Sequence, residues 1–165
     1  MKQCLFAFLI CILVSMASAD DLKSHIASFD RQMTSAMMKK DFTQVKKLIK
    51  GEIAPNFVYE ENGRRQSLEQ MLAGIKMGIG QMNLRYANSK VLTLMNKGTS
   101  QVATVHHQIG GTAVGEDKKM HKMTFDGVSE NTYVKIGKTW KMSKMRWIKQ
   151  STMIDGKEIP TQGGR

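Results

Sequence analysis

The chain has 165 residues, with 25 Lys and Arg against 14 Asp and Glu, and 41% of its residues are apolar. These values leave room for one ordinary domain and exclude a multidomain enzyme, a disordered polymer and a polytopic membrane protein. The net charge of +11 predicts a cationic surface. Such a surface suits anionic envelope surfaces or acidic ligands, and it equally suits a protein that is simply soluble.

The first nineteen residues have the pattern of a cleaved secretory signal. Lys2 supplies one positive charge, residues 4–16 are almost wholly apolar, and Ala17-Ser18-Ala19 has the small-x-small pattern of a signal-peptidase site. The apolar run is shorter than the ~20 residues that a membrane-spanning helix needs. We therefore predict that residues 1–19 are a signal peptide, that the protein is secreted or periplasmic, and that no membrane anchor remains after cleavage.

Cleavage at this point also changes the chemistry that is available. Both cysteines, Cys4 and Cys11, lie in the signal. The mature chain therefore has no thiol, which excludes a disulfide framework, a cysteine-bound zinc ion and a cysteine nucleophile.

The first two predicted helices follow the signal. Apolar residues recur at helical spacing over residues 22–37, behind Asp20-Asp21, whose carboxylates suit a helix N-terminus. Asp41 begins a capping box with Gln44, and the second helix should end near Lys50, with Gly51 as a left-handed C-cap.

A short strand and a third helix come next. The β-prone residues 57–59 run into the turn-like pair Asn62-Gly63. Ser67 and Gln70 then form a second capping-box pattern and predict a helix whose C-terminal end is weakened by glycines.

The second half of the chain has the period of β-strands. Strands are expected over residues 91–95, 102–109, 120–125, 132–136 and 139–149. Helices followed by strands in one short domain predict an α+β fold, in which about three N-terminal helices pack on a curved antiparallel sheet. We expect this domain to cover residues 20–152 and residues 153–165 to form a flexible tail.

Two stretches resemble the nuclear transport factor 2-like superfamily, and especially its SnoaL-like branch. Residues 40–64, with Ser67 opening the next helix, resemble the helix, first strand and turn of that superfamily. Residues 132–142 resemble its closing hairpin, in which a tryptophan, here Trp140, follows a turn that contains glycine, here Gly137-Lys138.

This resemblance extends over about residues 22–149. It implies a cone-shaped fold whose open-ended interior holds a small ligand in some members and serves only to bind a partner chain in others. The shared motifs concern packing and turns, so they indicate the fold better than the chemistry.

Glu61 is the leading candidate for catalysis. Strand alternation puts Phe57, Tyr59 and Glu61 on one face, and if this face is interior, Glu61 brings a carboxylate into an apolar mouth lined by tyrosine. The resemblance implies a general base here, because isomerase members carry an aspartate just before the corresponding turn. The alternative interpretation is a solvated acid in a turn.

The last long strand offers further pocket candidates. Unless a bulge intervenes, alternation places Trp140, Met142 and Arg146 on one face. If this face is interior, Trp140 and Met142 line the pocket, and Arg146 near the rim is placed to hold an anionic ligand. The alternative for Arg146 is a guanidinium that extends from the sheet edge to solvent.

Histidines complete the set of candidates. His106 and His107 are adjacent in a predicted strand, so they point to opposite faces and cannot chelate one metal ion together. His107 is a pocket candidate, or else a half-buried histidine held by hydrogen bonds. His121 between Met120 and Met123 invites a copper(I) interpretation, but the methionines are spread through helices and strands as core filler, and no metal or cofactor is predicted.

We therefore predict an exported protein that binds a small, partly apolar molecule and forms a homodimer through its sheet. Whether this molecule is anionic is left open. One alternative is a cofactor-free isomerase, dehydratase or cyclase with Glu61 as base. Another is a non-catalytic envelope module with a filled cone that binds a partner protein. Nucleic-acid binding is not expected, because the lysines are not interleaved with stacking aromatic residues.

Overall fold

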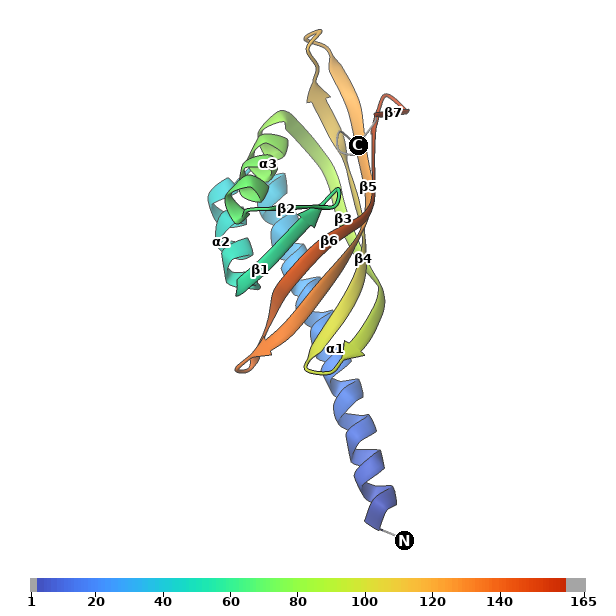
Figure 1. Ribbon diagram of the computed structural model, residues 1–165. Coiled ribbons are helices and arrows are strands. Elements are labelled where there is room, and N and C mark those ends of the chain that lie inside the picture. The colour runs from blue at the N-terminus through green and yellow to red at the C-terminus, as the bar shows by residue number, and fades with distance from the viewer. Residues whose placement is uncertain (1–2, 160–165) are drawn as a thin grey trace.

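The computed structural model describes the backbone of residues 3–159 and the side chains of residues 20–159. Three helices lie on one side of a curved sheet (Figure 1). The helices are α1 (Gln3–Met38), α2 (Phe42–Glu52) and α3 (Leu68–Gln81). The strands are β1 (Ile53–Glu61), β2 (Arg64–Gln66), β3 (Met82–Lys97), β4 (Ser100–Val114), β5 (Met120–Ile136), β6 (Thr139–Ile154) and β7 (Lys157–Ile159).

The sheet order confirms the predicted α+β class and adds one feature. The strands follow the order β2-β1-β6-β5-β4-β3, and β7 pairs with β6. All these pairs are antiparallel except β1 with β6, which is parallel. The sheet is therefore mixed and mostly antiparallel, whereas the sequence predicted antiparallel pairing alone.

The helix starts follow the capping residues that the sequence indicated. Asp41 Oδ1 accepts a hydrogen bond of 2.9 Å from the Gln44 backbone N–H. Ser67 and Gln70 form a complete capping box at the start of α3. The C-cap expected at Gly51 was wrong: α2 continues to Glu52, and the chain passes directly into β1 at an extended residue, Ile53.

Two strand boundaries also differ from the sequence prediction. The segments expected at 120–125 and 132–136 belong to one strand, β5, of 17 residues. The polar stretch between them resembles a turn, but Gly127, Ser129 and Asn131 alternate as buried positions of this strand. Residues 153–159, expected in a flexible tail, instead end β6 and form β7 around a turn at Asp155-Gly156, where both φ angles are positive.

Two groups of buried apolar residues fill the space between the helices and the sheet. The first joins α1 to β4, β5 and β6 through residues such as Leu22, Val105 and Trp140. The second joins all three helices to β1 through residues such as Val45, Tyr59 and Leu72. The side chains of the predicted signal, residues 1–19, and all of residues 160–165 lie outside the described residues.

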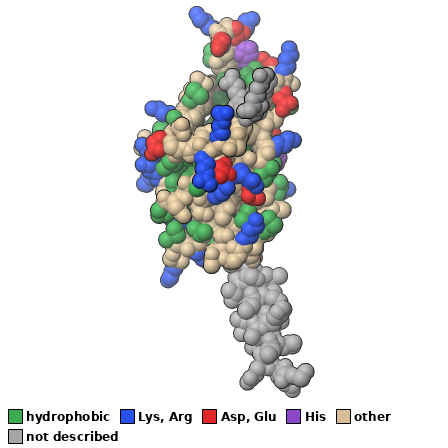
Figure 2. Space-filling model, in the orientation of Figure 1, with side chains coloured by type: hydrophobic (Ala, Val, Ile, Leu, Met, Phe, Trp, Pro, Cys, Tyr) green, Lys and Arg blue, Asp and Glu red, His purple; other side chains and the backbone are tan. Residues whose placement is uncertain are grey.

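Charged side chains are scattered over the surface. In the view of Figure 2, Lys and Arg spread over the domain, with Asp and Glu among them. Within the described part of the chain, no helix is long and apolar enough to span a membrane.

Candidate functional site

A cavity of about 180 Å³ lies between the helices and the inner face of the sheet. Its wall is mostly apolar and includes five methionines: Met33, Met37, Met71, Met142 and Met145. Asn88 and Ser89, on the edge strand β3, also line the cavity and are exposed, so the cavity opens to solvent there. A cavity of comparable size in a protein core holds benzene, so this space is large enough for a small ring.

A row of polar groups crosses the cavity wall from α1 to β5. The Asp30 carboxyl on α1 lies next to the Ser89 hydroxyl on β3, which lowers the pKa of Asp30. Ser89 Oγ lies 3.1 Å from His107 Nδ1 on β4, and His107 Nε2 lies 2.9 Å from Ser129 Oγ on β5. Ser89 and His107 are directly opposite each other in the β3–β4 register, so their side chains share the inner face.

One protonation pattern satisfies every group in this row. With its proton on Nδ1, His107 donates to Ser89 Oγ, and the Ser89 hydroxyl is then free to donate to Asp30. The Ser129 hydroxyl donates to His107 Nε2 in the same pattern. The row therefore connects an acid near the mouth of the cavity to a fully buried serine.

Burial shifts both titratable groups of the row toward their neutral forms. Burial raises the pKa of Asp30 from 3.8 to about 6, and the Ser89 hydroxyl only partly offsets this. Burial also lowers the pKa of His107 to about 4, and the neighbouring His106 adds to that effect. At neutral pH, His107 is therefore an uncharged imidazole, while Asp30 titrates close to the physiological range.

A second acid, Glu52 at the end of α2, lines the same cavity. The residue is 95% shielded from solvent, and its two carboxylate oxygens lie 2.9 Å and 3.0 Å from His25 Nε2 on α1. Burial raises the pKa of Glu52, and the nearby His25 opposes this shift. Glu52 and Phe29 also line an outer groove between α1 and α2, so they form the wall between groove and cavity.

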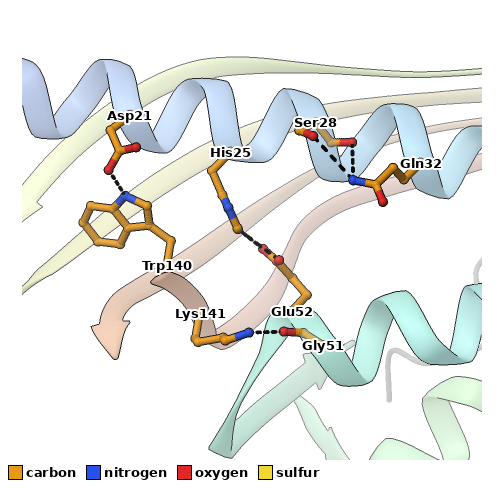
Figure 3. A network of polar contacts seen from close by, with 8 residues as sticks. All are labelled: Asp21, His25, Ser28, Gln32, Gly51, Glu52, Trp140 and Lys141. Atoms are coloured by element: carbon orange, nitrogen blue, oxygen red, sulfur yellow. Dashed lines mark hydrogen bonds and ion pairs between the residues drawn. The ribbon is translucent and has the colours of Figure 1, made fainter. Parts of the chain in front are cut away.

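Neighbouring polar contacts hold this wall in place. In Figure 3, His25 extends from α1 toward Glu52 on α2, and the Lys141 ammonium binds the Gly51 carbonyl oxygen. In the same view, Trp140 Nε1 donates a 3.0 Å hydrogen bond to Asp21 Oδ2. The first helix is thus connected to both α2 and β6 by side-chain contacts.

The structure brings three of the seven candidate residues to the cavity wall. Phe57, His107 and Met142 line it. Tyr59 and Trp140 are buried in the two apolar clusters, where the Tyr59 hydroxyl accepts a 2.9 Å hydrogen bond from Trp147 Nε1.

Glu61 lies outside the residues that line the cavity. It is half-buried at the end of β1, and each of its carboxylate oxygens accepts a hydrogen bond from a glutamine amide. The donors are Gln66, at 3.0 Å, and Gln150, at 2.9 Å. Its part in catalysis stays a prediction.

Arg146 points to the outer face, contrary to the expected alternation, because β6 contains a bulge. Met142 pairs with Tyr133, and Lys144 pairs with the preceding residue of β5, so Ser143 is an extra residue. After Ser143 the alternation is reversed, and Met145 and Trp147 face inward in place of Arg146. Arg146 instead forms an exposed ion pair of 3.1 Å with Glu130.

His121 is also held away from the cavity. Its Nδ1 lies 2.6 Å from Asp155 Oδ2, and its Nε2 lies 2.8 Å from Asp117 Oδ1. Among the described residues, no group of three or more His, Asp or Glu side chains is arranged to hold a metal ion.

Sequence reasoning missed Asp30, Ser89 and Glu52. Asp30 has a detectable signal, because it lies four residues after Ile26 and three before Met33, inside the apolar stripe of its helix. An acid at such a position faces the core. Ser89 has no comparable signal, because its place depends on the β3–β4 register.

Comparisons with known proteins give the fold. No family model matches the sequence, and no curated protein matches it. Among solved structures, the chain is similar to a conserved protein from Planctomyces limnophilus, with a TM-score of 0.57 and 15% identity over 78% of this chain and 94% of that one.

Two other similar structures carry a fold name. One is a nuclear transport factor 2-like protein from Cytophaga hutchinsonii, with a TM-score of 0.54 and 13% identity over 76% of this chain and 95% of that one. The other is a nuclear transport factor 2-like protein of unknown function in nutrient uptake from Rhodospirillum rubrum, with a TM-score of 0.51 and 15% identity over 74% and 95% of the two chains. Three helices on a curved, mostly antiparallel sheet, together with these likenesses, give the chain the nuclear transport factor 2-like fold.

Proposed function

We propose that the protein binds a small, partly apolar molecule inside its cone. The observation that carries this proposal is the cavity of about 180 Å³, apolar over most of its wall and crossed by the row Asp30–Ser89–His107–Ser129. Apolar pockets with a few placed polar groups are typical of small-molecule sites, in which the polar groups set the orientation of the ligand.

A cavity-filling substitution tests this proposal. Ala87→Leu adds three carbon atoms at the cavity wall, and the probe is benzyl alcohol, a benzene-sized ring with one hydroxyl. We expect calorimetry to detect binding of benzyl alcohol to the wild type and at least about tenfold weaker binding to Ala87→Leu, because the added side chain occupies the space.

The matched control is Ala73→Leu, the same change at an exposed position of α3. It should bind benzyl alcohol as the wild type does. Equal binding by the wild type and Ala87→Leu, or no binding to any of the three proteins, would reject the cavity as the ligand site.

One observation favours a second function, proton transfer without a cofactor. A carboxyl with a pKa of about 6 in an apolar cavity suits a general base at neutral pH, where such groups contribute roughly 10²–10⁴ in rate. We propose Asp30, with the neutral His107 connected to it through Ser89, as the base of an isomerase or lyase.

A probe reaction distinguishes the two candidate acids. The probe is 5-nitrobenzisoxazole, which opens to a coloured phenolate when a base removes its ring proton and the N–O bond breaks. We expect Asp30→Asn to lose the rate above background and Glu61→Gln to keep it. The reverse result would assign the base to Glu61. If the wild type shows no rate above background, proton transfer is rejected and only the proposal of ligand binding remains.

We also propose that the chain belongs to the SnoaL-like branch and is exported after cleavage behind Ala19. The signal pattern of residues 1–19 supports export, and the domain starts next to the cut, where Asp21 contacts Trp140 and Leu22 is fully buried. N-terminal sequencing of the protein from the periplasm or medium of its native host should begin at Asp20. A start at Met1 would contradict this. Homodimerisation through the sheet stays a prediction.

A further inference from the structure

We propose that the ligand of this cavity carries a protonated amine, which binds between the carboxyl groups of Asp30 and Glu52 while its apolar part packs against the methionines. The inference rests on the proposed function and names the class of molecule that the site takes. It concerns the only formal charges on the described wall of the cavity, since its 18 lining residues include two acids and no Lys or Arg.

The charge of the wall excludes a good fit for an anion. Two carboxyl groups face the same cavity, and each raises the electrostatic cost of a further negative charge there. His107, the other titratable group of the wall, is held uncharged by burial, so it offers no compensating cation. Arg146, which the sequence suggested for an anionic ligand, is paired with Glu130 on the outer face.

Asp30 has unused capacity for a cationic donor. A carboxylate has about four acceptor positions, and the side-chain partner described for Asp30 is one neutral donor, the Ser89 hydroxyl. A buried carboxylate without a cation is unfavourable, and a charge-assisted hydrogen bond from an ammonium group removes that penalty. An ammonium group has three such donors.

Glu52 is the second anchor because it reaches the cavity while held from behind. His25 contacts both of its carboxylate oxygens from the side of the outer groove. The carboxyl is thereby fixed in the wall and not free to swing into the cavity. Asp30 and Glu52 line one cavity, and the charge of Asp30 adds to the raised pKa of Glu52, whereas His25 and Lys141 oppose that shift.

Three probes of nearly equal size separate charge from shape. They are benzylamine, benzyl alcohol and benzoate, which share one ring and carry a positive, a neutral and a negative group at neutral pH. We expect calorimetry at about pH 7.5 to show benzylamine binding at least about tenfold more tightly than benzyl alcohol, since the amine adds charge-assisted hydrogen bonds. Benzoate should bind most weakly.

Two variants locate the preference. Asp30→Asn should bring benzylamine down to the affinity of benzyl alcohol without weakening benzyl alcohol, and Glu52→Gln should reduce the preference as well. The matched control is Asp126→Asn, an exposed acid of the outer face paired with His106, which should keep the full preference for the amine.

The outcomes also separate this inference from the proposed function. Benzyl alcohol that binds in the cavity as tightly as benzylamine, or a preference for benzoate, would overturn the amine inference and leave ligand binding intact. If the double variant Asp30→Asn/Glu52→Gln still prefers benzylamine to benzyl alcohol, the amine inference is also overturned. If none of the three probes binds, both the amine inference and the proposed ligand-binding function are rejected.

Discussion

The two faces of the curved sheet hold ionisable side chains in opposite ways. On the outer face, ionisable side chains pair with one another: His106 lies 2.9 Å from Asp126, and Arg146 lies 3.1 Å from Glu130. On the inner face, His107 contacts only hydroxyl groups among its described hydrogen-bond partners. Adjacent residues of one strand thus enter different electrostatic environments, and the inner one lies on the wall of the cavity.

The same contrast separates the surface from the cavity. The whole chain carries a net charge of +11, yet the formal charges on the cavity wall are both negative. The charge of the whole protein therefore does not indicate the charge of its cavity wall. Overall charge governs long-range encounters, whereas the few groups that line a pocket determine what it binds.

Deleting Ser143 should break the distinction between the faces most severely. Without this bulge, the alternation of β6 is continuous from Trp140 to Trp147, which turns either Arg146 inward or Trp140 outward. We expect a loss of at least about 3 kcal/mol, because a buried, unpaired charge is strongly destabilising. Thermal unfolding followed by circular dichroism measures this loss of stability.

The control is Ser143→Ala, which keeps the bulge and removes only the hydrogen bond to the Thr132 carbonyl. It should lose about 1 kcal/mol of stability. Equal losses in the deletion and in Ser143→Ala would show that the bulge does not set the alternation.

Asp30→Asn should stabilise the protein at neutral pH when no ligand is added. Because burial raises the pKa of Asp30 from 3.8 to about 6, the native protein takes up this proton before the unfolded chain does. The penalty is therefore complete above about pH 6 and disappears toward pH 4. We expect a gain on the order of 2 kcal/mol at pH 7.5 and none near pH 4, measured by urea denaturation.

The outer face supplies the control for that experiment. The pKa of Asp126 is lowered by hydrogen bonds from His106 and Gln108, so Asp126→Asn should slightly destabilise the protein at pH 7.5, by less than about 1 kcal/mol. If both substitutions change stability in the same direction, the proposed difference between the two faces is wrong.

His107→Gln should change the response to acid with the opposite sign from Asp30→Asn. The pKa of His107 in the native protein is about 4, below its ordinary value of 6.5. The unfolded chain therefore binds the proton first, and the stability contribution of neutral His107 is present above pH 6.5 and lost as the pH falls toward 4.

We expect the variant to lose less stability than the wild type between pH 6.5 and 4, by on the order of 2 kcal/mol. Denaturation midpoints at several pH values in this range measure the difference. Identical slopes for the two proteins would show that His107 is not held neutral.

The smallest effect is expected on the outer face. Arg146→Ala removes an exposed ion pair with Glu130, and such pairs contribute about 0–1 kcal/mol. The loss should decrease further at high salt, because exposed charges are screened. Benzyl alcohol should bind unchanged, and weaker binding measured by calorimetry would return Arg146 to the ligand site.

Local signals predicted the helical half of the fold well. The capping residues Asp41 and Ser67 act within three or four positions of the chain, so their sequence patterns contain the whole interaction. The alternation of β6 failed at Ser143, because the bulge exists only in relation to β5. The parallel pairing of β1 with β6 joins segments far apart in sequence, and no local pattern specifies such a partner.

The candidate site was harder to predict than the fold. His107 and Met142 were found because their strand positions alternate with apolar neighbours. Asp30 was not found because an acid in a helix is usually solvated, and its meaning appears only once its helix is seen to lie across the sheet. Glu52 depends in the same way on where α2 ends.

The contact between Asp21 and Trp140 sets the order in which the protein can be completed. The hydrogen bond joins residues 119 positions apart, and Lys135 also pairs with Asp21, at 3.2 Å. The helices can form early because their contacts are local, whereas closing the core requires a strand made near the end of synthesis. The nascent chain therefore cannot close its core until most of it has been synthesised, and until then its helices lack the strands on which they finally pack.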